Sequence, residues 1–227
     1  MILSLYTFCI YIYNSDASDI IPLLIPCIRR KDIRMHTEVY IEVSARHVHL
    51  SQEILNVLFG NGYELTSQKT LGSGFAANES VLLSGPKGTI SNVRILGPAR
   101  NVTQIEISKT DAKVLGIDPP IRMSGELEGS APITLTGPAG TCDIEHGVIV
   151  AKRHIHMDID TATVNNIYNN QMVQVQVKNE DRSIIFGDVV CRVYNKKAKR
   201  YGAAMHIDTD EANAASIENT SFGFLIV

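Results

Sequence analysis

The stretch that decides the fold is VYIEVSARHVHL, residues 39–50. Apolar side chains occupy every second position from Val39 to Val43, and the same alternation then carries His47 and His49. A period of two is typical of a β-strand, so we expect one continuous strand here. Side chains two residues apart project from the same face of a strand. The two imidazoles can therefore converge on one metal ion.

A close copy of this frame recurs in the second half of the chain, where RHIHM at residues 153–157 repeats RHVHL at residues 46–50. Histidine is the commonest metal ligand in proteins. We expect His154 and His156 to form a second site with His206, which lies on a later predicted strand. The repeated order of strand, HxH and short helix indicates a duplicated unit.

The first HxH needs a third ligand, and Glu106 is the best candidate. It lies in QIEIS, residues 104–108, where the isoleucines mark the buried face and Glu106 the other. Two histidines and one carboxylate leave an open position on zinc, as in catalytic sites. The alternative for each HxH is a hydrogen-bonded pair of strand histidines. His36 and His146 lack such a context and are predicted not to bind metal.

Arg100 ends a Gly-Pro-Ala-Arg turn six residues before Glu106. The forked donors of a guanidinium suit bidentate binding of phosphate. The alternative is an ordinary surface arginine.

Composition limits the classes of function. The chain has 227 residues, 44% of them hydrophobic, and a formal net charge of −3. This balance gives no general attraction to nucleic acid or to an acidic membrane, and no apolar run reaches the ~20 residues that span a bilayer. The four cysteines show no CxxC spacing, so we expect a reduced, cytoplasmic protein. The basic run Lys196–Arg200 is predicted to be a solvated turn.

Many short predicted strands separated by Gly/Pro turns favour small β-barrels over a parallel sheet. Residues 1–34 are predicted to lie outside the fold, with Met35 as the start of translation; a targeting or encapsulation segment is the rival interpretation. The remaining expected parts are a first strand and helix at 35–62, a central barrel at 63–147, a second barrel at 148–220 joined by the 35–62 strand, and a tail at 221–227.

Short helices are expected where capping residues precede helical segments. The expected helices are Gln52 to Phe59 after Ser51, a turn capped by Thr110 or Asp111 and ended by Gly116, one started by Asp158 or Asp160, and a last one through Ala215 capped from Asp208.

Together these segments resemble the PduL-type phosphate acyltransferases, or phosphotransacylases, over about residues 38–216. The matching stretches are VSARHVHLS (43–51), LGPAR (96–100), QIEIS (104–108), TDA (110–112), LGIDPP (115–120), GVIVAKRHIHM (147–157) and MHIDTDEANA (205–214). The resemblance implies a mainly β fold of two small β-barrels capped by short α-helices, with the active site between them.

The resemblance also implies an activity, which is the reversible conversion of acyl-CoA and phosphate into acyl phosphate and CoA. It implies two metal ions per subunit, typically zinc. His47, His49 and Glu106 would hold one ion, and His154, His156 and His206 the other. Arg100 would bind phosphate and serve as the catalytic residue.

Further implications concern setting and partners. The resemblance implies a homodimer and, for members of propanediol degradation, a bacterial microcompartment with its shell or cargo enzymes. The alternatives are a binuclear metal-dependent hydrolase and a non-catalytic metal-binding protein.

Overall fold

The computed structural model of the protein describes residues 37–72, 74–180, 182–195, 202–217 and 221–226. The elements described below belong to one compact unit, His36–Val227. The extension 1–34, His36 and the basic run Lys196–Arg200 lie outside the described residues. Of the helices in the described ranges, none has the length and apolarity needed to span a membrane.

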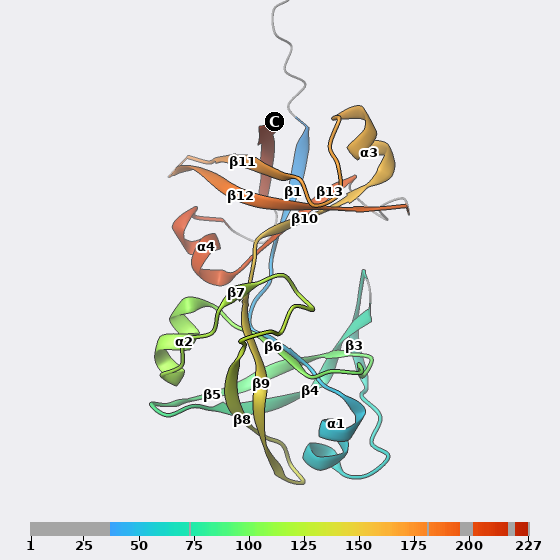
Figure 1. Ribbon diagram of the computed structural model, residues 1–227, viewed down its shortest axis with the longest axis vertical. Coiled ribbons are helices and arrows are strands. Elements are labelled where there is room, and N and C mark those ends of the chain that lie inside the picture. The colour runs from blue at the N-terminus through green and yellow to red at the C-terminus, as the bar shows by residue number, and fades with distance from the viewer. Residues whose placement is uncertain (1–36, 73, 181, 196–201, 218–220, 227) are drawn as a thin grey trace, which may run out of the picture. The chain divides into compact units, whose positions relative to one another are not determined.

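Six strands close into a barrel that we call the C-terminal barrel, in the order β1-β13-β10-β12-β11-β14. Its strands are β1 (Glu38–Val43), β10 (His154–Asp158), β11 (Met172–Lys178), β12 (Ser183–Tyr194), β13 (Ala203–Ile207) and β14 (Ser221–Ile226). The ring brings the first described strand beside the last, because β1 pairs in parallel with β13 and antiparallel with β14 (Figure 1).

A second ring, the central barrel, follows from the pairings β4-β5-β2-β6-β9-β8 and back to β4. Its strands are β2 (His47–His49), β4 (Gly74–Ser84), β5 (Thr89–Gly97), β6 (Gln104–Glu106), β8 (Ala131–Thr136) and β9 (Thr141–Ala151). Two further strands lie outside the ring: β3 (Ser67–Leu71) pairs antiparallel with β4, and β7 (Ile121–Arg122) pairs in parallel with β9. The helices are α1 (Gln52–Phe59), α2 (Lys109–Leu115), α3 (Ile159–Val164) and α4 (Thr209–Ala214). The prediction of two small barrels with short helices is confirmed.

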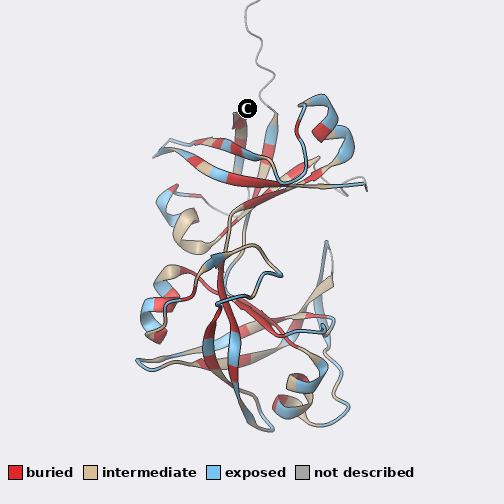
Figure 2. Cartoon of the chain, in the orientation of Figure 1, coloured by how far each residue is buried: buried red, intermediate tan, exposed pale blue. Residues whose placement is uncertain are grey.

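Each barrel has its own apolar core (Figure 2). Ile41, Ile155 and Met205 lie in the C-terminal core, and all are fully buried. Val48 and Ile105 lie in the central core. Each such side chain contributes roughly 1.5–3 kcal/mol when it leaves water.

The predicted continuous strand is wrong, because the chain leaves one barrel and enters the other between Val43 and His47. β1 pairs with β13 and β14, whereas β2 pairs with β5 and β6. The alternation of side chains continues on both sides of the crossing, but both faces of β2 are buried. Val48 packs into the central core, while His47 and His49 project from the opposite face. The second crossing lies between β9 and β10, directly before the second HxH.

Two further differences concern the ends of elements. The segment after Ser221, expected to be a tail, forms β14 and pairs with β1 and β11. Helix α2 is capped by Ser108 rather than by Thr110 or Asp111. Asp111 is the third residue of the helix, and its carboxylate accepts a hydrogen bond from the Ser108 N–H, which completes a capping box. The caps Ser51, Asp158 and Asp208 are as expected.

Candidate metal centre

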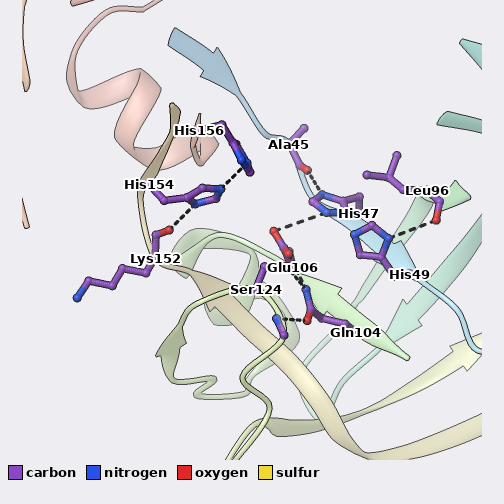
Figure 3. A network of polar contacts seen from close by, with 11 residues as sticks. Ala45, His47, His49, Leu96, Gln104, Glu106, Ser124, Lys152, His154 and His156 are labelled. Atoms are coloured by element: carbon purple, nitrogen blue, oxygen red, sulfur yellow. Dashed lines mark hydrogen bonds and ion pairs between the residues drawn. The ribbon is translucent and has the colours of Figure 1, made fainter. Parts of the chain in front are cut away.

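The first group that could hold a metal ion contains His47 and His49 on β2 and Glu106 on β6 (Figure 3). β2 and β6 run antiparallel, and His47 stands directly opposite Glu106. One ligand atom from each residue lies within 4.8 Å of the others. Nε2 of His47 is 3.6 Å from Oε2 of Glu106. The structure thus brings together the three residues that the sequence placed at one ion.

Backbone carbonyls hold both imidazoles of this group. Nδ1 of His47 is 2.9 Å from the Ala45 carbonyl oxygen, and Nδ1 of His49 is 3.3 Å from that of Leu96. A carbonyl only accepts hydrogen bonds, so each Nδ1 must carry the proton and donate it. The lone pair is then on Nε2, ready for a metal ion.

The local electrostatics favour the metal-binding protonation states of His49 and Glu106. Burial, followed by the positive charges of His47 and Arg100, lowers the pKa of His49 to about 4. Burial pushes the pKa of Glu106 upward, but His47, Ser124 and His49 outweigh it, so the pKa lies below its usual range. At neutral pH His49 is therefore a neutral donor and Glu106 an anionic one.

The second group contains His154 and His156 on β10 and His206 on β13. His154 stands opposite His206 in an antiparallel pair, in the same register as His47 opposite Glu106. Nδ1 of His154 is 2.9 Å from the Lys152 carbonyl, again two residues earlier in the chain. Nε2 of His154 lies 3.1 Å from Nε2 of His156 (Figure 3). Burial lowers the pKa of His154, and that of His156 to about 3.

The donor sets fit zinc, which takes imidazole nitrogen and carboxylate oxygen in both structural and catalytic sites. For His47, His49 and His154, the contact of Nδ1 with a carbonyl is the outer hydrogen bond that typically accompanies a metal-binding histidine, and it leaves Nε2 free for an ion. A pocket is lined by Glu106 from the first group and by His154 and His206 from the second. One member of the first group and two members of the second therefore border the same pocket.

Arg100 lies beside the first group. Its backbone N–H donates to the Leu50 carbonyl at 2.8 Å, directly after the HxH strand. Its positive charge lowers the pKa of His49, and the negative charge of Glu106 acts on it in turn. The residue is thus near the side chains of the first candidate metal group.

Sequence reasoning missed the carboxylate next to the second group. Oε2 of Glu42 on β1 is 2.9 Å from Nε2 of His206, and the two residues are register partners on adjacent parallel strands. The hydrogen bond from His206 lowers the pKa of Glu42 below its usual range. The alternation in β1 indicates that Glu42 points away from the core, but it does not predict which residue lies beside it on β13.

It also missed two arginines that occupy matching places in the repeat. Arg46, just before His47, contacts Asp111 at 3.0 Å through its Nε and its NH2 group. Arg153, just before His154, contacts Glu211 at 3.1 Å. The signal was in the sequence, because both pentads begin with arginine.

The two acids hold matching places as well. Asp111 and Glu211 each occupy the third position of a capping-box helix. Each follows the third ligand of its own group by five residues, Glu106 in one case and His206 in the other. The expected duplication therefore extends to the supports of the two sites.

His146 lies apart from both groups, with Nδ1 3.5 Å from the Ser130 carbonyl. Among the described residues, it belongs to neither of the two groups that could hold a metal ion.

Comparison with known proteins decides the family. Residues 40–218 match the family model described as phosphate propanoyltransferase. The chain belongs to the phosphate propanoyltransferase family. This membership confirms the expected family and the expected enzyme class, an acyltransferase.

Several relatives carry that name. The phosphate propanoyltransferase of Thermotoga maritima is 47% identical over 196 residues, which are 86% of this chain and 91% of the relative. That of Lachnoclostridium phytofermentans is 49% identical over 181 residues, 79% and 83% of the two chains. That of Salmonella typhimurium is 45% identical over 179 residues, 78% and 83%.

Proposed function

We propose that the chain is a metal-dependent phosphotransacylase. It interconverts a short-chain acyl-CoA, propanoyl-CoA or acetyl-CoA, and phosphate with the acyl phosphate and CoA. The observation that carries this proposal is the pair of three-donor groups on one pocket, with Arg100 beside the first. The family membership supports the acyl transfer to phosphate.

The first ion would be held by His47, His49 and Glu106. The second would be held by the three histidines His154, His156 and His206. We propose zinc for both, and other divalent metals suit the same donors. Bound zinc would supply Lewis-acid charge for the thioester carbonyl oxygen and the departing thiolate.

Arg100 would bind phosphate through its forked donors and hold one phosphate oxygen toward the thioester carbon. A C–O bond forms at that carbon, the C–S bond breaks, and the sulfur leaves with the electron pair as the CoA thiolate. Positioning and charge neutralisation therefore carry the reaction, and the acyl group passes directly from sulfur to phosphate.

The described cysteines support direct attack over an acyl-enzyme. Cys191 is fully buried in the C-terminal core, and burial raises the pKa of its thiol to about 11. A thiol in that state is a poor nucleophile at neutral pH. Cys142 lies near the start of β9, outside the pocket lining.

The test combines a thiol-release assay with metal analysis of the full-length protein. Propanoyl-, acetyl- and butanoyl-CoA are each incubated with and without phosphate. We expect CoA release only with phosphate, formation of acyl phosphate, and about two zinc ions per chain, as two three-donor groups require. CoA release without phosphate would instead indicate a hydrolase, and metal binding without turnover a non-catalytic protein.

A second measurement addresses the direct attack. An acyl-enzyme would exchange labelled CoA into acyl-CoA in the absence of phosphate, whereas direct attack requires phosphate for that exchange. Exchange without phosphate would therefore rule out the proposed route.

The assembly and setting are separate proposals. The family resemblance supports a homodimer and an association with microcompartment shell or cargo enzymes. Sedimentation of the full-length protein would test the dimer, and co-purification with assembled shells would test the association.

A further inference from the structure

Gln104 on β6 lies next to the first candidate metal group, two residues before Glu106. β2 and β6 pair so that His47 stands opposite Glu106 and His49 opposite Gln104. Side chains two apart on a strand share a face, so Gln104 and Glu106 both point toward the metal-binding side (Figure 3). Gln104 is only 3% exposed, which is unusual for an amide side chain outside a hydrogen-bond network.

Three hydrogen bonds use almost all the capacity of this amide. Nε2 donates to Oε1 of Glu106 at 2.6 Å and to Oγ of Ser124 at 2.9 Å. Oε1 accepts from the backbone N–H of Gly125 at 2.8 Å. A backbone N–H only donates, so the oxygen must face Gly125, and both amide hydrogens then face Glu106 and Ser124.

As a consequence, the two carboxylate oxygens of Glu106 have different partners. Oε1 is taken by Gln104, while Oε2 faces Nε2 of His47 at 3.6 Å. One oxygen is thus directed to the ligand group, and the carboxylate cannot rotate without losing the hydrogen bond from Gln104. The backbone at Gly125 has a φ of +101°, a conformation that favours glycine, and it turns the N–H toward Gln104.

The repeat provides an internal comparison. In the second group the residue opposite the second histidine, His156, is Ala204. An alanine side chain has no hydrogen-bond donor, and the third member of that group is a histidine, His206, rather than a carboxylate. The amide therefore accompanies the carboxylate ligand and is not a general requirement of the repeated fold.

We propose that Gln104 is a positioning residue of the first metal site. It fixes Glu106 as a one-oxygen ligand and ties that ligand to the segment from Ser124 to Gly125. This inference rests on the proposed metal dependence, and it adds a residue that acts on the metal through Glu106.

The test measures zinc affinity one site at a time by competition with a chromophoric chelator. His154→Ala disables the second group and leaves the first, whereas His49→Ala does the reverse. Gln104→Met has a similar size but no donor, and it is added to each background. Loss of an outer hydrogen bond typically weakens metal binding about 10–100-fold. We expect that loss in the His154→Ala background and a change below about twofold in the His49→Ala background.

Gln174→Met is the matched control, because Gln174 is an exposed strand glutamine in the C-terminal barrel. We expect it to change neither affinity. An equal loss in both backgrounds would mean that Gln104 supports the fold alone, and no loss in either would mean that Glu106 needs no positioning. Either result would overturn the inference about Gln104 without contradicting the proposed phosphotransacylase function. If the His154→Ala protein itself did not bind zinc, the first group would not be a metal site, and this result would contradict the proposed metal-dependent function.

Discussion

Single nitrogen atoms decide what the histidines can do. Carbonyls two residues earlier in the chain fix the Nδ1 atoms of His47 and His154, so that Nε2 remains as the donor atom. The convergence of each HxH pair was predictable, because alternation places residues i and i+2 on one face, and Glu106 and His206 were correctly expected beside them. Neither Glu42 nor Gln104 was expected as a support, since their partners depend on strand register, which periodicity does not encode.

The lowered pKa of His49 predicts how stability varies with pH. The ring titrates at about 4 in the folded chain and at 6.5 in the unfolded chain. Between these values the unfolded state binds more protons, so the free energy of unfolding falls as pH decreases from 6.5 to about 4. Above pH 6.5 the contribution is complete.

The measurement is urea denaturation of metal-free protein across this pH range. His49→Ala should flatten the dependence relative to wild type. An unchanged slope would mean that His49 already titrates normally when no metal is bound.

Arg100→Ala should reduce phosphate-dependent turnover about 100-fold or more, because a preorganised donor to phosphate is lost. The zinc content should remain, since the guanidinium is not a ligand. Arg100→Lys should recover part of the activity, because it keeps the charge and loses the fork. Steady-state kinetics with varied phosphate would show the effect, with the exposed Lys178→Ala as a control that we expect to behave as wild type. Unchanged phosphate kinetics would contradict the assignment.

At the scale of elements, the repeated unit is a strand, an arginine and a capped helix. Arg46 and Arg153 each connect an HxH strand to the helix that follows the third ligand. The sequence predicted the caps Ser51 and Asp208 and left Asp158 as one of two candidates for α3, because capping is a local interaction. It misplaced the cap of α2, where several capping residues lie in a row and only the geometry selects Ser108.

Arg153→Ala should lower the free energy of unfolding by about 1–3 kcal/mol, because it leaves Glu211 without its cation in a mostly buried position. Burial already raises the pKa of Glu211, which shows the cost of its charge there. Asp118→Ala is the control, since the pair with Lys109 is highly exposed and should be worth less than about 1 kcal/mol. Denaturant titration compares the two, and equal losses would contradict the repeated role of the arginine.

For the whole molecule, the sequence predicted two barrels but not how the chain is shared between them. Short apolar strands and Gly/Pro turns indicate barrels wherever they occur. The pairing of β1 with β13 and β14 joins segments far apart in the chain, and local pattern carries no record of it. For the same reason the residues after Ser221 gave no sign that they would close a ring.

The position of β1 in the C-terminal barrel has a consequence for the order of folding. Strands β2 to β9 form the central barrel from one continuous piece of chain, so that ring can close while the rest is still being synthesised. β1 leaves the ribosome earlier but must wait for β13 and β14, and such distant pairings form slowly. Pulse-labelling hydrogen exchange during refolding should therefore protect the amides of β4 and β5 before those of β1. Until then β1 presents unpaired strand edges, which can pair with other chains and promote aggregation.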